Sequence, residues 1–564
     1  MNVAFDRWIP VVNAKGEREL ASLCSVFAEG RKYVDLAVRP HERVALMRLL
    51  LCVAHAALDG PRDYDEWCEV PKRLPDAALA YLEKWRDAFE LFHPATPWLQ
   101  VSKLNGDKPS PVALLDFALA TGNNSTLNDH EGQILQRPIQ DARIALSLLT
   151  FQCFSPGGGS PIAQWENVKR LQVGNPDAPC LSQSMAHAMI RGELLAETIT
   201  LNLPTFEGIA RSYQSCSLLT RDDKEHNLWK RMEFDDIALG RPVWEMFPFK
   251  PDFLAQESVN ATRTYLGRLV PIARWIRLLS ATEMYCCNGF KYDTFRDGFP
   301  AEPTASVHLS RKTDVKGVET VERSVVPVTP SKALWRELSA LLVKRSAFGL
   351  GGALTIENAP YDKAFDFHVC AMVRDQASMD IAIESVFHIS PTFYVNTATY
   401  QTEVQQAERL EQKLGWAVET YRKEVDGGWE GRLKGAGKDS GKLRKKLHSM
   451  ATGYYWTTVE KKLGLLMAYI DSIGSDAAIT LKERWRKLVF KSACEAYSLA
   501  CSHETPRQHR AFAKGYQKLT AMKDKPEMDS TKKIRRTINE HISGTAPHVQ
   551  GGSGNDGESP LHSC

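Results

Sequence analysis

The apolar residues in the first part of the chain recur every three or four positions, which is the spacing of amphipathic helices. One such helix is predicted to begin at Pro40, because proline is favoured in the first helical turn. Its buried face is predicted to carry Val44, Met47, Leu50 and Leu51. Further helices are predicted over 76–92, from Ser110–Pro111 with Ser110 as the N-cap, and over 142–149.

Between residues 193 and 373 the pattern changes to alternation of apolar and polar residues, which is typical of strands. Residues 198–203 alternate in this way, and 307–312 with 319–326 predict a hairpin. A strand over 365–369 leads into a short polar turn within 370–378. Helices and strands in this mixture predict an α+β body.

After about residue 397 the helical spacing returns, in four amphipathic segments over 407–425, 455–470, 481–499 and 505–519. The fourth begins at Thr505–Pro506, a capping residue followed by a first-turn proline. The sequence therefore predicts an α+β chain with a large mixed N-terminal globular domain and a C-terminal four-helix bundle. The predicted boundaries are 1–396 for the mixed domain, 397–542 for the bundle and 543–564 for a disordered tail.

The composition is that of a soluble protein of two or more domains, with 564 residues, 43% hydrophobic and 25% charged. The net charge is only +3, yet residues 401–540 hold 28 Lys and Arg against 18 Asp and Glu. This uneven charge favours a polyanionic partner at the C-terminal part. A solvated helical surface fits the same count.

The twelve cysteines show no Cys-x-x-Cys spacing, so a zinc ribbon is unsupported and no metal site is predicted. Scattered thiols fit a reducing cytoplasm. The first residues contain no apolar signal region, and the most apolar run, 46–58, is too short to span a bilayer. We therefore expect a cytoplasmic protein with no membrane partner.

Three consecutive glycines, Gly157, Gly158 and Gly159, follow the helix predicted over 142–149 and lie between two prolines. This stretch, here called the glycine loop, cannot continue that helix. A surface turn accounts for it, and so does a backbone platform that lies against a phosphate or a nucleic-acid groove. No Lys-[Ser/Thr] pair follows, which excludes the standard nucleotide-binding loop.

No catalytic constellation is evident in the sequence. The fifteen histidines lie apart, without a His-Asp metal dyad or a His-Glu-x-x-His motif. The segment 435–441 only superficially resembles a phosphate loop, because Arg432 and Asp439 stand where a glycine and a hydroxyl residue belong. The sequence therefore predicts no catalytic residue and no cofactor.

Two groups of polar residues are candidates for contacts with nucleic acid. A basic group recurs on the predicted bundle helices and consists of Arg444, Lys445, Lys446, Lys482 and Arg484. It could follow a phosphate backbone without reading bases, or it is a solvated helix face. In the polar turn, Arg374, Asp375 and Gln376 are side chains of the kinds that read base edges, and they equally fit a solvated hairpin.

Several stretches, which precede the predicted bundle, share their order and spacing with one known family. They are Asp6–Val11, Pro97–Gln100, 121–129, Pro156–Gly159, Leu201–Leu203, Pro330–Trp335 and Asp375–Ser378. In this arrangement the chain resembles the CasA family, the large subunit of the type I-E CRISPR surveillance complex Cascade. No single stretch is specific, and the resemblance depends on their order along nearly the whole chain.

The resemblance implies a subunit that is not an enzyme. It would recognise the protospacer-adjacent motif (PAM) in double-stranded target DNA and help to open the duplex for guide-RNA pairing, which forms an R-loop. The implied partners are the target DNA, the crRNA-bearing Cascade subunits and a helicase-nuclease effector that docks on this subunit.

The family's functional residues fall on specific positions of this sequence. Its minor-groove glycine loop falls on Gly157, Gly158 and Gly159, and its glutamine wedge on Gln376, flanked by Asp375 and Ala377. Lys291 is the candidate for its lysine finger. The loop that anchors the subunit in the complex falls on Asn123, Asn124, Leu127 and Asn128.

Two features depart from the family's pattern. Asp375 stands beside the wedge where a neutral amide is expected, and the C-terminal tail has no counterpart. A carboxylate there would repel phosphates or accept from a cytosine amine, so the motif preference is open. Two rival classes also stay open, a nuclease or nucleotide hydrolase with an unrecognised site and a helical scaffold with no nucleic-acid role.

Overall fold

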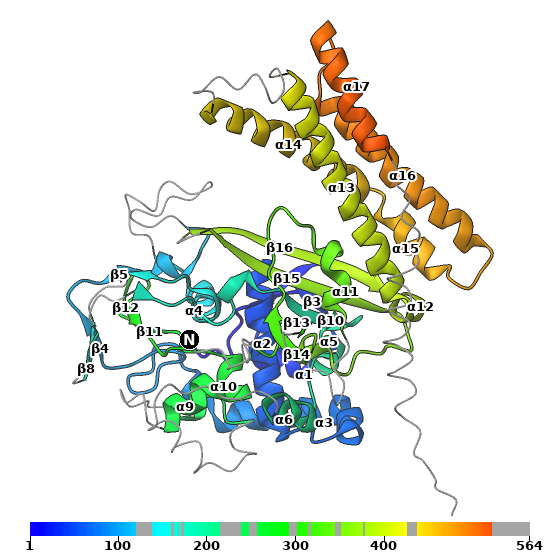
Figure 1. The fold of residues 1–564 in the computed structure, drawn as a ribbon. Helices are drawn as coiled ribbons and strands as arrows, with labels where there is room; N and C mark the ends of the chain where they lie inside the picture. Colours follow the sequence, from blue (N-terminus) through cyan, green and yellow to red (C-terminus); the bar gives the residue numbers. More distant parts are fainter. Residues whose placement is uncertain are drawn as a thin grey trace, which may run out of the picture. The chain divides into compact units, whose positions relative to one another are not determined.

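The computed structural model describes residues 1–119, 138–159, 163–166, 168–170, 174–214, 239–246, 256–292, 302–313, 317, 319–343, 351–375, 378–425 and 437–521. The chain divides into two compact units, which are coloured along the sequence in Figure 1. The first unit contains 1–405 and 464–483, and the second contains 406–463 and 484–564. The domain boundaries predicted from the sequence stay predictions, and the tail over 543–564 lies outside the described residues.

The described part of the first unit contains several small antiparallel sheets. The first, in the order β2-β1-β3, consists of β1 Ile9–Asn13, β2 Arg18–Ala21 and β3 Tyr33–Leu36. The second, in the order β10-β15-β16, consists of β10 His187–Arg191, β15 Phe365–Asp375 and β16 Ser378–Ile389. The third, in the order β11-β12-β5, consists of β5 Ser110–Pro111, β11 Arg274–Leu278 and β12 Glu283–Asn288. A fourth sheet, in the order β4-β7-β8, consists of β4 Leu104–Gly106, β7 Ala163–Trp165 and β8 Val168–Arg170. Two further sheets are strand pairs: β6 Gly158–Gly159 with β9 Gly174–Asn175, and β13 Val307–Thr313 with β14 Glu319–Val325.

Helices surround and separate these sheets (Figure 1). The α-helices before the second unit are α1 Leu23–Ala28, α2 Pro40–Leu58, α3 Tyr64–Lys84, α4 Asp141–Phe154, α5 Leu195–Leu201, α6 Phe206–Gln214, α9 Gln256–Arg263, α10 Tyr265–Leu269, α11 Leu338–Leu341 and α12 Pro391–Val395. Short 3-10 turns are η1 Arg86–Phe89, η2 Val112–Leu115, η4 Ser182–Ser184, η5 Val243–Met246, η6 Leu334–Glu337 and η7 Leu354–Ile356. The C-terminal helices are α13 Thr397–Val425, α14 Gly437–Glu460, α15 Leu463–Asp471, α16 Ala477–Ala500 and α17 Pro506–Thr520. The predicted α+β class is confirmed.

The helix α2 lies in the middle of the first unit (Figure 1). It begins at Pro40, as predicted, and the Glu42 side chain accepts a hydrogen bond from the Arg39 backbone N–H at 3.0 Å, which caps its first turn. The predicted buried face is confirmed, but burial extends round the other sides of the helix as well. A helix that is apolar all round belongs in a core rather than at a surface.

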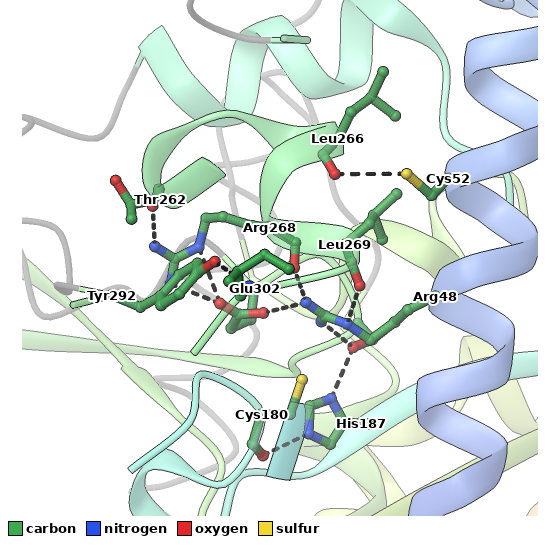
Figure 2. A network of polar contacts seen from close by, with 12 residues as sticks. Arg48, Cys52, Cys180, His187, Thr262, Leu266, Arg268, Leu269, Tyr292 and Glu302 are labelled. Carbon is green, nitrogen blue, oxygen red and sulfur yellow. Dashed lines mark hydrogen bonds and ion pairs between the residues drawn. The ribbon is translucent and has the colours of Figure 1, made fainter. Parts of the chain in front are cut away.

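One charged residue on α2, Arg48, is wholly buried and takes part in the ionic network of Figure 2. Its Nη2 lies 2.7 Å from Glu302 Oε2, while Arg268 Nη2 lies 2.6 Å from Glu302 Oε1. Arg48 Nε also donates to the Leu269 carbonyl at 2.9 Å. Burial acts to raise the pKa of Glu302, but the two guanidinium groups hold that pKa below its ordinary value. The ionised carboxylate therefore joins α2, α10 and the segment before β13.

The helix predicted to begin at Ser110–Pro111 is wrong. The two residues form β5, in which Ser110 pairs with Met284 and Pro111 with Glu283 of β12. The next backbone N–H, that of Val112, donates to the Thr282 carbonyl at 2.9 Å. The segment therefore bonds to a distant strand and continues only as the 3-10 turn η2.

The strand predicted over 198–203 is also wrong, because most of this segment is in the helix α5. Thr198 Oγ1 and Thr200 Oγ1 each donate at 3.1 Å to the carbonyl four residues earlier. Threonine is helix-compatible in this arrangement, since its hydroxyl is satisfied by the helix itself. The helix predicted over 76–92 begins earlier, as α3 at Tyr64, and ends at Lys84 before η1.

The second unit contains most of α13 together with α14, α17 and the greater part of α16. Tyr455 of α14 donates to the Ala407 carbonyl of α13 at 2.9 Å. At Gly515 of α17 an added Cβ would lie 2.7 Å from the Ala417 carbonyl, so glycine permits the close approach of α13 and α17. The predicted cap of the last helix is confirmed, because Thr505 Oγ1 accepts from the Gln508 N–H at 3.3 Å.

The prediction of a single helix over 455–470 is wrong, because α14 ends at Glu460 and α15 begins at Leu463. No helix in the described part of the chain has an apolar stretch long enough to cross a bilayer.

Candidate nucleic-acid interface

The glycine loop follows directly from α4 and presents bare backbone to solvent. Gly157 is buried, whereas Gly158 and Gly159 are exposed and form β6, which pairs with β9. Gly158 has φ +146°, a conformation that favours glycine, and a Cβ added there would meet nothing within 4 Å. Glycine at 158 is therefore required by the backbone conformation and not by crowding, and the space in front of it is open.

Arg274, at the start of β11, holds the glycine loop from the protein side. Its Nη2 donates at 2.9 Å both to the Pro156 carbonyl and to the Pro176 carbonyl, which lie on the two arms of the loop pair β6–β9. The side chain is buried, and this burial lowers the pKa of the guanidinium. Gln152 of α4 fixes the backbone of Arg274, since Gln152 Nε2 donates to its carbonyl at 2.8 Å and Gln152 Oε1 accepts from its N–H at 2.8 Å. We call this arrangement the Arg274 clamp.

A single carboxylate, Asp177, connects the glycine loop with the hairpin β15–β16. The Gly157 N–H donates to Asp177 Oδ1 at 2.7 Å, and the guanidinium of Arg374 forms an ion pair with the same oxygen. The Arg374 backbone N–H also donates to Ser184 Oγ at 3.2 Å. Arg374 stands one residue before Asp375 at the end of β15, so the two regions predicted to recognise DNA share one acceptor. Arg374 is paired with Asp177 in this structure, and its suggested role in reading bases stays a prediction.

The Asp177 link predicts different results for two substitutions. Asp177→Asn keeps an oxygen that can accept from the Gly157 N–H but loses the charge opposite Arg374, whereas Asp177→Ala loses both. Hydrogen exchange of the Gly157 amide should therefore remain slow in Asp177→Asn and become fast in Asp177→Ala. The free energy of unfolding should fall by about 1 kcal/mol in the first variant and by more in the second. Equal exchange rates in the two variants would contradict the link.

Lys291 follows a segment that is fixed next to the Arg274 clamp. The Gly289 N–H donates to the Ala273 carbonyl and the Phe290 N–H to the Ile272 carbonyl, each at 3.2 Å. The Phe290 ring packs edge-on against Trp275 with centroids 6.1 Å apart. Lys291 itself is exposed. The structure thus brings its segment to the strand that holds the glycine loop.

The other predicted site residues are described in part or not at all. Asp375 and Arg444 are described by their backbone only, in β15 and α14. Lys445 and Lys446 on α14 and Arg484 on α16 are exposed, and Lys482 on α16 is half-buried. Gln376, Ala377, Asn123, Asn124, Leu127 and Asn128 lie outside the described residues. The roles assigned to all of these residues stay predictions.

Asp177 and Arg274 are the residues that the sequence did not single out. The run Gly174-Asn175-Pro176-Asp177 has the composition of a turn, which marks a loop but gives no partner for its carboxylate. Arg274 lies at a buried position in the short strand β11, and its charge is the only feature of the sequence that could have marked it as a functional residue.

Comparison with known proteins identifies the fold. The family model described as CRISPR-associated protein Cse1 matches residues 2–496. The CRISPR-associated protein CasA/Cse1 of Thermus thermophilus is 26% identical over 519 residues, which are 88% of this chain and 91% of that protein. The crystal structure of Thermus thermophilus CasA has a TM-score of 0.66 at 23% identity and covers 92% of this chain and 98% of its own. A chain of a solved CRISPR RNA-guided surveillance complex has a TM-score of 0.65 at 17% identity, with coverage of 92% and 99%.

The fold is thus that of a CRISPR-associated large subunit of the CasA type. Because the family model spans most of the sequence, the chain belongs to the CRISPR-associated protein Cse1 family. The resemblance stated from the sequence is confirmed.

Proposed function

We propose that this chain is the subunit of a type I-E CRISPR surveillance complex that recognises the PAM in double-stranded DNA and promotes duplex opening. The observation that carries the proposal is the exposed, side-chain-free backbone at Gly158 and Gly159. The neighbouring Gly157 N–H donates to Asp177, which pairs with Arg374 near the end of β15. The similarity to a chain of an RNA-guided surveillance complex supports its place in such an assembly.

The geometry suits minor-groove recognition. The minor groove presents a degenerate pattern of donors and acceptors, so a backbone platform there reads groove shape and the presence of a guanine amine. Such a reader tolerates several related short motifs. Sequence identity is then left to base pairing with the guide RNA, as in other RNA-guided systems. Gln376, which lies between β15 and β16 in the sequence, would insert beneath the motif and start strand separation.

The proposed partners are the target duplex, the crRNA-bearing subunits and a helicase-nuclease effector that this subunit helps to recruit in the cytoplasm. The loop containing Asn123, Asn124, Leu127 and Asn128 would anchor the chain in the complex. The chain itself would bind without catalysis, and the effector would cut.

The experiment that tests this function compares the complex assembled with and without the chain, on duplexes with and without the motif. We expect motif-dependent binding and strand opening only when the chain is present. The chain alone should neither cleave DNA nor hydrolyse nucleotide, with or without divalent metal. Motif-dependent opening in its absence would refute the proposal, and metal-dependent cleavage abolished by one point substitution would favour the nuclease alternative.

The basic helix α14 gives a separate prediction about the DNA backbone. Reversing both charges in Lys445→Glu/Lys446→Glu should weaken duplex binding by the complex for all sequences alike. The slope of log K against log salt should flatten by about 0.9 for each phosphate contact that is lost. The control is Lys15→Glu/Lys72→Glu, which reverses two exposed lysines of the first unit and should leave the slope unchanged. Equal slopes in the two variants would mean that Lys445 and Lys446 are only a solvated face.

A further inference from the structure

The hairpin β15–β16 brings three residues with metal-binding side chains together. His368 and Cys370 are two positions apart on β15, so they point to the same face of the strand. Glu384 of β16 is the register partner of Cys370. The ligand atoms of the three side chains all lie within 4.8 Å of one another. The pairing of the two strands therefore assembles a His/Cys/Glu group that no spacing in the sequence suggests.

Two of the three distances within this group match those of a tetrahedral zinc site, and the third, between Cys370 and Glu384, is no longer than 4.8 Å. His368 Nε2 lies 3.3 Å from Glu384 Oε2, and Cys370 Sγ lies 3.4 Å from His368 Nε2. With Zn–S near 2.3 Å and Zn–N or Zn–O near 2.0–2.2 Å, neighbouring ligand atoms around a tetrahedral ion are about 3.3–3.6 Å apart. His368 is therefore already spaced for an ion it would share with either Cys370 or Glu384.

The surroundings leave one side of the group accessible. His368 and Cys370 are buried, whereas the Glu384 side chain is 46% exposed and lines a cavity of about 670 Å³. Water in that cavity could supply a fourth ligand. Arg43 also lines the cavity, but its charge is paired with Asp35 and its Nη2 donates to the Leu36 carbonyl at 2.9 Å. The charge of Arg43 is thus partly neutralised by its own carboxylate partner, Asp35.

We propose that His368, Cys370 and Glu384 bind a divalent zinc-like cation that fastens β15 to β16. A thiolate and an imidazole favour zinc over the hard cations magnesium and calcium, and a carboxylate oxygen is a further ligand type that zinc accepts. Binding displaces the proton of the Cys370 thiol. The cation joins β15 and β16, which flank Gln376 in the sequence, so its effect is on the rigidity of that strand pair.

The test uses the full-length chain, freed of metal by a chelator and titrated with Co²⁺, whose thiolate complexes absorb visibly. We expect one Co²⁺ per chain with a thiolate charge-transfer band, and displacement of that band by Zn²⁺. Cys370→Ser should abolish the band. Glu384→Gln, a change at a half-exposed position that leaves the core intact, should weaken Co²⁺ binding by at least the factor of about 10–100 that loss of an outer-shell partner causes, because it removes a direct ligand. The control is Cys68→Ser, which removes an exposed thiol outside the group and should leave the titration unchanged.

The alternative is an ordinary hydrogen bond between His368 and Glu384 beside a buried thiol. In that case the unsubstituted chain gives no thiolate band, and the proposal is overturned. A band that persists in Cys370→Ser, or Co²⁺ affinity that is unaltered in Glu384→Gln, overturns it equally. Cys370 is buried, so Cys370→Ser could fail to fold. Glu384 is half-exposed, so Glu384→Gln should fold and still allows the Co²⁺ affinity to be measured.

Discussion

Gly159→Asp is expected to abolish motif-dependent duplex binding by the assembled complex while the melting temperature of the chain stays nearly unchanged. Gly159 is exposed in β6, so a side chain there would add bulk at the surface of the loop. A carboxylate adds bulk and a negative charge at a surface proposed to meet DNA, whose phosphates repel it. Gly158 is less suitable for this test, because its φ of +146° would make a substitution strained regardless of DNA.

Binding should be measured on duplexes with and without the motif, together with thermal unfolding of the isolated chain. Gly464→Asp is the matched control, since Gly464 is an exposed glycine on α15 where an added Cβ meets nothing within 4 Å. It introduces the same charge and should bind target normally. Gln376→Ala should differ from both: motif binding persists but strand opening slows, because a wedge acts on base unstacking, which costs a few kcal/mol per step. Normal target binding by Gly159→Asp would show that the minor-groove assignment is wrong.

Glu302→Gln is expected to lower the free energy of unfolding by about 3–5 kcal/mol. The substitution keeps the shape of the side chain but removes the negative charge that Arg48 and Arg268 both face in a fully buried network (Figure 2). Urea unfolding of the isolated chain measures the change. The control is Glu69→Gln, which breaks an exposed ion pair with Lys72 at 3.0 Å and should cost less than about 1 kcal/mol. Similar losses in the two variants would mean that the network contributes no more than a surface pair.

The same network predicts the direction of the acid response. The folded pKa of Glu302 lies below its ordinary value of 4.5. Its stabilisation is therefore complete above pH 4.5 and is lost as the pH falls further, through the folded pKa.

The local sequence pattern was sufficient to predict those elements that are determined by residues close together in the chain. The start of α2 at Pro40, the Thr505 cap and the hairpin β13–β14 all follow from neighbouring residues. Periodicity was misleading where a distant segment decided the outcome. Ser110, for example, lies in a strand because it pairs with Met284 of β12. Thr198 is helical for a different, local reason, since its hydroxyl donates to the carbonyl one turn earlier.

The contacts that support the candidate site and the buried ionic network join residues far apart in the sequence, so local pattern does not reveal them. Asp177 and Arg374 are 197 positions apart, and Arg48 bonds to the carbonyl of a residue 221 positions away. Charge type alone does not select such partners from 71 basic and 68 acidic residues. The sequence could therefore indicate the glycine loop and the hairpin turn as candidates, but not the carboxylate that connects them.

The Arg274 clamp changes the thermodynamics of any contact that the glycine loop makes. A free run of three glycines samples many backbone states, and fixing each residue costs roughly 1–2 kcal/mol of conformational entropy. In this protein the carbonyls of Pro156 and Pro176 are already held by one buried guanidinium, so much of that ordering occurs when the chain folds. A ligand that meets the loop finds its shape preset and loses little affinity to ordering it. Glycine supplies bare backbone, and Arg274 removes the flexibility that glycine would otherwise bring.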